Sequence, residues 1–212
     1  LLNGEYIEYL PIGYISVKGE FSNGLKTGVW ETFNENGDIF SIVKYVNDYQ
    51  NGNWKFFHNS GNLPLEGIFK NGYESGQWIS YYDGGELDEI GEYINGLKDG
   101  KWGRFHVGGS LKQEEIYKLG KLIEVSDFYL SDGNVFKNET FDNGNGELFD
   151  YYEDGNIFSI AKYKNGLLNG MYSEYHTNGK ISQSGMYKNG EKSGIWNEYN
   201  RRGGEIKRKT YD

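Results

Sequence analysis

The three histidines are the side chains best suited to binding a metal or moving protons near neutral pH. They are His58, His106 and His176, and each lies in a different copy of the repeat described below. At ~4.8 Å between neighbouring strands, these copies would hold the histidines roughly 20–30 Å apart, whereas histidine ligands of one zinc ion lie about 2 Å from it. We therefore expect no metal site and no Ser-His-Asp group, and we assign the histidines to positions beside turns.

Two glycine-rich segments resemble ligand-binding loops in their glycine spacing but lack residues that such loops need. Gly96–Lys101 has three residues between its glycines, where a phosphate-binding loop has four, and Trp102 follows in place of Ser or Thr. Asp142–Glu147 carries Gly144 and Gly146 at places where a calcium loop needs oxygen-bearing side chains. We expect both segments to be plain links between strands, so no cofactor is predicted.

Carboxylates gather at Glu86, Asp88 and Glu89, and again at Glu114 and Glu115. Paired carboxylates could catalyse hydrolysis, but general acid–base work needs a cleft that shifts their pKa values. The single-layer fold derived below offers little cleft, so we interpret both groups as solvated faces. The sequence predicts a protein that is not an enzyme and has no catalytic residues.

The elements that would have to position these groups are copies of one short repeat that fills the chain. Counting from an opening residue at place 0, the repeat has Trp in five copies at place 2, an aromatic at place 5, a glycine at place 9, an aliphatic in most copies at place 11 and an aromatic at place 17. Asn-Gly stands at places 19 and 20 in most copies, and the spacing is 24 residues except for one interval of 22. The nine opening residues are Gly4, Gly28, Gly52, Gly76, Gly100, Glu124, Gly146, Gly170 and Gly194.

In one copy the pattern reads Gly76-x-Trp78-x-x-Tyr81-Tyr82 and closes on Tyr93-x-Asn-Gly. Repeated along essentially the whole sequence, it resembles the bacterial variant of the MORN repeat. The resemblance implies an open, single-layer solenoid of β-hairpins, and the protein and lipid contacts with which MORN repeats are credited. Some bacterial members are labelled antitoxins or immunity proteins, so the resemblance leaves such a role open here.

Each copy is expected to form two strands, for example Gly100–Val107 and Ser110–Lys118, because these segments are rich in aromatic and β-branched residues. Asn-Gly and Asp-Gly links between them are the strongest short signal for a hairpin. No segment shows a sustained 3.6-residue period. The predicted fold is therefore all-β, an elongated single-layer antiparallel β-hairpin solenoid of about nine 24-residue MORN-like repeats, with residues 1–212 as a single array.

The turn between the two strands decides which side chains share a face. A two-residue turn would group places 2, 11 and 17, whereas a three-residue turn with a bulge would group places 5, 11 and 17. We favour the second, because it sets the aromatic at place 5 opposite the aliphatic at place 11; the face that carries the tryptophans stays open. Glycine at place 15 leaves room for a neighbouring ring to lie over the backbone. The four copies with this glycine contain Gly19, Gly67, Gly91 and Gly185.

The pattern becomes irregular over residues of about 119–148. Leu119 replaces the Asn of the Asn-Gly link, Glu124 and Ser126 replace the opening Gly and the Trp, and the link Asn143–Gly146 is two residues short. Because stability in a repeat array is a sum of neighbour contacts, we predict that this joint is a hinge or the first part of the array to open.

Charge limits the class of partner. The chain has 22 Lys and Arg against 31 Asp and Glu, a net charge of −9 and a pI of about 5.0. Phosphate backbones and anionic lipids are repelled by such a protein, so we expect a basic protein partner and neither nucleic acid nor lipid. No stretch approaches the ~18 apolar residues of a membrane helix. With no cysteine, disulfides and thiolate chemistry are excluded.

The start of the chain matches the inside of a repeat. Leu1-Leu2-Asn3-Gly4 repeats Leu167–Gly170, and there is no initiator Met. We expect a fragment or a processed product. The compartment is therefore left unassigned, and a signal peptide upstream remains open.

Most of the aromatic side chains are expected to hold the sheet together. A single layer nevertheless leaves part of each aromatic row exposed, and exposed rings are frequent anchors of binding. Trp30, Trp54, Trp78 and Trp102 form the longest unbroken row, so we predict that they contact a partner. The predicted function is a non-catalytic scaffold for protein–protein interaction, with an antitoxin or immunity role as one form of it. The alternative is a carbohydrate-binding surface, since stacked rings beside carboxylates suit sugars.

Overall fold

The computed structural model describes residues 1–57 and 63–212. Within them the chain forms antiparallel β-strands joined by turns, and no helix is present, so none is long and apolar enough to cross a membrane. The prediction of an all-β fold made of successive hairpins in open sheets is confirmed. The chain divides into two compact units, Leu1–Ser110 and Leu111–Asp212.

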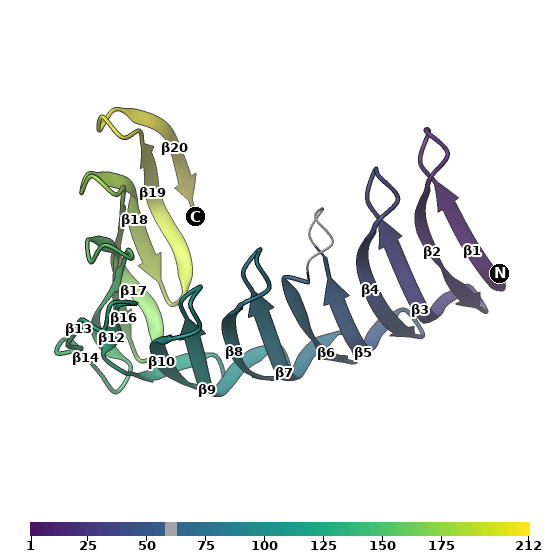
Figure 1. The fold of residues 1–212 in the computed structure, drawn as a ribbon, viewed down its shortest axis with the longest axis horizontal. Coiled ribbons are helices and arrows are strands. Elements are labelled where there is room, and N and C mark those ends of the chain that lie inside the picture. The colour runs from purple at the N-terminus through teal and green to yellow at the C-terminus, as the bar shows by residue number, and fades with distance from the viewer. Residues whose placement is uncertain (58–62) are drawn as a thin grey trace. The chain divides into compact units, whose positions relative to one another are not determined.

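In the first unit each strand is hydrogen-bonded to the next strand in the sequence (Figure 1). The strands of this unit are β1 (Gly4–Tyr9), β2 (Ile15–Ser22), β3 (Leu25–Phe33), β4 (Ile39–Val46), β5 (Tyr49–Phe56), β6 (Leu65–Lys70), β7 (Tyr73–Tyr81), β8 (Leu87–Ile94) and β9 (Leu97–Phe105).

The second unit contains a long open sheet, β14 to β20 in sequence order, and two short pairs, β10 with β11 and β12 with β13. Its strands are β10 (Leu111–Lys118), β11 (Lys121–Val125), β12 (Phe128–Tyr129), β13 (Val135–Phe136), β14 (Phe141–Asp142), β15 (Asn145–Tyr151), β16 (Ile157–Lys164), β17 (Leu167–Tyr175), β18 (Ile181–Lys188), β19 (Glu191–Tyr199) and β20 (Glu205–Tyr211).

The turn inside each repeat whose loop the structure describes is a three-residue loop, as the sequence predicted. Between β1 and β2, Leu10 N donates to Tyr14 O at 2.7 Å and Gly13 N donates to Leu10 O at 2.8 Å. Gly13 has φ 92°, the left-handed conformation that glycine adopts without steric cost. Tyr9 then pairs with Ile15, so the residue at place 5 faces the residue at place 11.

The link between repeats is a two-residue turn with positive φ at both residues, which is why Asn-Gly recurs there. Asn95 and Gly96 have φ 50° and 79°, and Ile94 pairs directly with Leu97. This turn explains an error in the predicted strand bounds. The first strand of the repeat begins at Leu97, not at Gly100, because so tight a turn leads straight into the next strand.

Opening glycines such as Gly28 lie inside strands and act as bulges. In β3, Gly28 has φ 68°, and the register between β2 and β3 shifts by two residues between Lys18 and Glu20. Only glycine adopts this conformation readily in a strand. The bulge therefore sets which side chains of the repeat face the same way.

The irregular joint differs from the regular repeats in its strands, since β12, β13 and β14 have two residues each. Its backbone is closely packed: a Cβ atom on Gly146 would lie 1.8 Å from Thr140 O. The Asp127 carboxylate holds the segment, since it accepts bonds from Lys137 Nζ at 2.6 Å and from Asn138 N at 3.0 Å. That the joint is a hinge, and that residues 1–212 form a single array, stay predictions.

Candidate binding surface

Four of the five tryptophans lie directly over a glycine of the preceding repeat. A Cβ atom built on Gly91 would lie 2.0 Å from the ring of Trp102, and one on Gly67 would lie 2.3 Å from the ring of Trp78. The prediction that the glycine at place 15 leaves room for a neighbouring ring is thus confirmed. The four pairs are Gly19 with Trp30, Gly67 with Trp78, Gly91 with Trp102 and Gly185 with Trp196.

These tryptophans are buried within the protein's own packing. Trp30, Trp78 and Trp102 are 3%, 7% and 2% exposed. Trp102 Nε1 donates to Glu92 O at 3.1 Å, and Trp78 Nε1 donates to Ile68 O at 3.3 Å. Three of the four tryptophans predicted to bind a partner therefore leave little ring surface free, and that contact itself stays a prediction.

The aromatic residues at place 17 pack edge-on against the tryptophans. The ring centroids of Phe69 and Trp78 are 5.2 Å apart at 87°, and those of Tyr93 and Trp102 are 5.0 Å apart at 85°. Such T-shaped pairs are a favoured aromatic geometry. The favoured grouping of places 5, 11 and 17 on one face was therefore wrong. Places 2 and 17 share a face even though the loop has three residues, because a further register shift lies between Ser80 and Tyr81.

A lysine two residues before the opening glycine covers several of these rings. Lys26 Nζ lies 4.2 Å from the ring centroid of Trp30, Lys98 Nζ lies 3.9 Å from that of Trp102, and Lys192 Nζ lies 3.9 Å from that of Trp196. An ammonium group over a tryptophan face is attracted by the ring quadrupole. The ammonium groups of these lysines therefore cover the tryptophan rings, so side chains of the protein itself take the place that a ligand could take.

Trp54 departs from the pattern in the residue beneath it and in the residue at the lysine place. Val43, not glycine, pairs with it across the strands, and Gln50 stands where the covering lysine would be. The Trp54 side chain is only partly buried. In the other copies the tryptophan ring lies over a glycine, but here the Val43 side chain occupies that space. Trp54 is therefore the tryptophan of the predicted row that keeps accessible ring surface.

The opposite face of the first unit mixes exposed aliphatic side chains with ion pairs. Val29 and Ile68 are exposed, and Lys18 Nζ lies 3.1 Å from Glu31 Oε2. Exposed pairs of this kind contribute little to stability. A shallow groove of about 260 Å³ crosses β5, β6 and β7. It is lined by Asn53, Trp54, Lys55, Glu66, Gly67, Ile68, Gln77 and Ile79.

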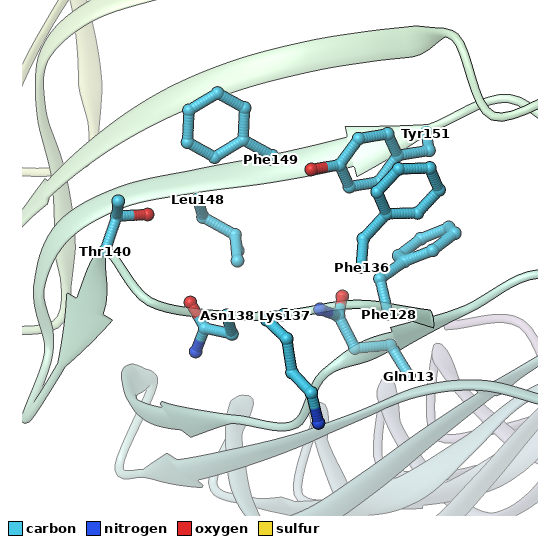
Figure 2. A pocket seen from close by; sticks show the side chains of 9 residues that line it. All are labelled: Gln113, Phe128, Phe136, Lys137, Asn138, Thr140, Leu148, Phe149 and Tyr151. Carbon is cyan, nitrogen blue, oxygen red and sulfur yellow. The ribbon is translucent and has the colours of Figure 1, made fainter. Parts of the chain in front are cut away.

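A small cavity lies within the second unit, beneath the irregular joint (Figure 2). Its volume is about 20 Å³, which is enough for roughly one water molecule. The rings of Phe136 and Tyr151 stack at its edge, with centroids 4.2 Å apart and an angle of 11° between them. The cavity therefore has no space for a substrate.

The histidines lie beside turns, as expected for the two that the structure describes; His58 lies outside the described residues, as does Gly61 at place 9 of the same repeat. His106 is buried, and its N donates to Ser110 O at 2.9 Å. The His176 ring nitrogen Nε2 lies 2.8 Å from Tyr199 O of the next repeat. Over the described part of the chain, no three His, Cys, Asp or Glu side chains are grouped so as to hold a metal ion.

One interpretation of the acidic groups was wrong. Glu115 was expected on a solvated face, but it is buried and accepts a bond from Tyr117 Oη at 2.8 Å. It stands at place 15, where other repeats have glycine beneath a tryptophan. Since Ser126 replaces that tryptophan here, a larger residue fits at this place.

Burial and nearby carboxylates together raise the pKa of tyrosines that pack beside a tryptophan or take its place in the repeat. Burial raises the pKa of Tyr93, and the nearby Glu89 and Glu74 carboxylates raise it further. Burial also raises the pKa of Tyr172, which occupies the tryptophan place of its repeat, to about 12, with Glu174 contributing. These tyrosines therefore stay uncharged at neutral pH and serve as packing groups.

Charge is distributed unevenly between the units. Residues 1–110 contain 15 acidic and 8 basic residues, a net charge of −7, and residues 111–212 contain 16 and 14, a net charge of −2. The first unit therefore carries most of the negative charge, together with four of the five tryptophans.

No curated protein matches the chain. A family model, described as the MORN repeat variant, matches five stretches that together cover just over half of the chain. The stretches are residues 26–47, 50–71, 74–95, 144–165 and 168–189. Each begins shortly after a two-residue turn and spans one hairpin, for example β3 with β4. By these matches and by its fold, the chain belongs to the MORN repeat variant family.

Proposed function

We propose that this protein is a non-catalytic scaffold that binds a basic protein on its first unit. MORN repeats are in general scaffolds for interaction with proteins or membranes. The observation that carries the choice of a protein is the net charge of −7 on residues 1–110. Such a surface repels anionic lipid headgroups and attracts basic protein surfaces.

An antitoxin or immunity role is one form of this function, in which the basic partner is a toxin. Carbohydrate binding is less well supported by the geometry. A sugar stacks on an open ring face, whereas Trp30, Trp78 and Trp102 are buried. Two of these rings, those of Trp30 and Trp102, are also covered by lysine.

Affinity capture with the full chain as bait tests the proposal. The bait is exposed to extract of the source cell at ~50 mM and ~300 mM salt, because electrostatic attraction between exposed charges is screened by salt. We expect basic proteins to be enriched at low salt and released at high salt. Each captured protein is then purified and tested for direct binding.

Two parallel assays address the other classes of ligand. The chain is mixed with vesicles of neutral and of anionic lipid, and is applied to a glycan array. Binding to vesicles or to glycans, with no basic protein that binds directly, would contradict the proposal.

A further inference from the structure

The repeats themselves show how a lysine side chain can be bound, because lysines of the chain lie over tryptophan rings. In three of them, the lysine two residues before the opening glycine lies over the tryptophan of the repeat that this glycine opens. In two of these the same ammonium group also lies near the aromatic ring at place 17: Lys26 Nζ is 5.2 Å from the Tyr45 ring centroid, and Lys192 Nζ is 5.7 Å from that of Tyr211. A tryptophan and a second ring thus form a site for one ammonium group.

The same two kinds of ring are present at Trp54, but no lysine covers them within residues 1–57 and 63–212. The centroids of Trp54 and Phe69 lie 6.1 Å apart at 89°, close to the 6.1 Å and 76° of Trp30 and Tyr45. Gln50 replaces the lysine, and no residue in the described part of the chain accepts a hydrogen bond from Trp54 Nε1.

Phe56 stacks beside Trp54, with centroids 6.0 Å apart at 15°, yet the Trp54 side chain is only partly buried. The Trp78–Tyr93 pair also lacks the lysine, because Glu74 stands at that place, but Trp78 is buried.

The surroundings of Trp54 favour a cation. The next repeat has Glu74 at the lysine place, and this carboxylate lies close enough to Tyr93 to raise the pKa of that tyrosine. Trp54 also contacts Trp78, the tryptophan of the Glu74 repeat, at a centroid distance of 5.4 Å. Glu74 also pairs directly across the strands with Phe69, so this acidic side chain neighbours the ring pair, in a unit of net charge −7.

We propose that the Trp54–Phe69 ring pair, flanked by Gln50 and Glu74, binds a lysine side chain of a basic partner protein. The inference rests on the proposed function and deepens it, since it names the group that the partner contributes. The partner's ammonium group would take the place that Lys26, Lys98 and Lys192 take in the other repeats. The aliphatic part of its side chain would cover the ring, as amphipathic lysine side chains do.

The test uses the full chain and the peptide hexalysine, with hexa-acetyl-lysine as the uncharged counterpart. The indole N–H signals of the five tryptophans are followed by NMR, and overall binding is followed by anisotropy of labelled peptide. We expect hexalysine to shift the Trp54 signal most and the signals of the lysine-covered Trp30, Trp102 and Trp196 least. Hexa-acetyl-lysine should leave all five unchanged.

The decisive variant is Gln50→Lys, which gives Trp54 the lysine that its counterparts have. Its matched control is Asn53→Lys, which adds the same charge at an exposed residue on the opposite face of the same strand. Gln50→Lys should reduce the Trp54 shift at a fixed hexalysine concentration at least fivefold, whereas Asn53→Lys should reduce it less than twofold. A second variant, Val43→Gly, removes the side chain under Trp54 and should bury the indole and reduce the shift as well.

Three outcomes would overturn the inference: no Trp54 shift, equal shifts for the two lysine variants, or an equal response to the acetylated peptide. If hexalysine binds by anisotropy without moving Trp54, the lysine site is wrong while a basic partner on the first unit remains supported. The proposed function itself fails only in the capture experiment, so the two failures are distinguishable.

Discussion

The two units have the same turns, but different side chains pack between their hairpins. In residues 1–110, Trp30, Trp78 and Trp102 each lie over a glycine. In residues 111–212 that arrangement occurs at Trp196, whereas in the neighbouring repeat Tyr172 pairs with Ala161. The bulge glycines differ in the same way: φ is 66–69° where a tryptophan lies over glycine, and 122–130° at Gly52, Gly146 and Gly170.

The irregular joint in the second unit extends the comparison. There no tryptophan is present, and the buried side chains are Leu122, Phe128, Leu130 and Phe141. The hairpins therefore depend on turns that glycine and asparagine allow, whereas the side chains that pack between them vary from repeat to repeat. This difference teaches that a repeat of this chain can form without a tryptophan, so the proposal that Trp54 serves binding is compatible with the fold.

The largest effect is expected from Gly146→Ala in the joint. Its φ of 122° is unfavourable for alanine, and the new Cβ would meet Thr140 O. A rigid carbonyl cannot move aside easily, so we expect a loss of about 3 kcal/mol or more. Hydrogen exchange should show residues of about 126–150 opening first.

Gly133→Ala is the matched control, because Gly133 has φ 89° and nothing within 4 Å of its Cβ position. It carries the conformational penalty alone, about 1–2 kcal/mol. Equal losses for the two variants would show that the close packing of the joint is unimportant.

The next effect tests the tryptophan–glycine pairs. Gly91→Ala would place a methyl group inside the Trp102 ring position, and we expect it to lower the free energy of unfolding by about 2 kcal/mol. The control is Gly108→Ala, where the φ is ordinary and the space is open. If urea unfolding gave the same midpoint for both, the pairs would not support the first unit.

Leu119→Asn should stabilise the protein. Leu119 has φ 47° at the place where most other repeats have asparagine, and an L-residue with a large side chain is disfavoured there. We expect a gain of about 0.5–1 kcal/mol in urea unfolding. The same substitution at the exposed Leu97, which follows a turn and has negative φ, should give no gain; a gain at both sites would refute the explanation from backbone conformation.

The smallest effect concerns pH. The Lys137 ammonium group and the Asn138 N–H hold the pKa of Asp127 below its ordinary value. A lowered folded-state pKa stabilises the fold above the unfolded-state pKa of about 3.9, and this contribution is lost as pH falls through the folded-state value. Asp127→Asn should therefore be less stable than the wild type at pH 6, with the difference shrinking below about pH 4. A difference that is the same at both pH values would exclude a role for this charge.

The sequence predicted the features that depend on local residue type. Asn95-Gly96 predicted a tight turn, the pattern around place 9 favoured a three-residue loop, and Gly91 predicted a ring over the backbone. It favoured a face with places 5, 11 and 17 over one with places 2, 11 and 17. That choice was wrong because facing depends on two bulges whose register follows from backbone conformation. Glu115 was misplaced for the same reason.

The binding surface was predicted only in part. The row of tryptophans was visible in the sequence, but the burial of three of them was not, since it arises from contacts between repeats. A signal did exist, because lysine recurs at one place before Trp30, Trp102 and Trp196 while Gln50 stands before Trp54. This signal could be interpreted only once the structure gave the distances between the lysine ammonium groups and the tryptophan rings.

The central claim is that the first unit binds a basic partner, and the association rate of that partner tests it most directly. Glu20→Gln with Glu92→Gln removes two exposed charges from the first unit, and Glu124→Gln with Glu191→Gln removes two from the second. At low salt the first pair should slow association with the captured basic protein about two- to fivefold, and the second pair should leave it nearly unchanged. Equal slowing by both pairs, or greater slowing by the second, would contradict the account.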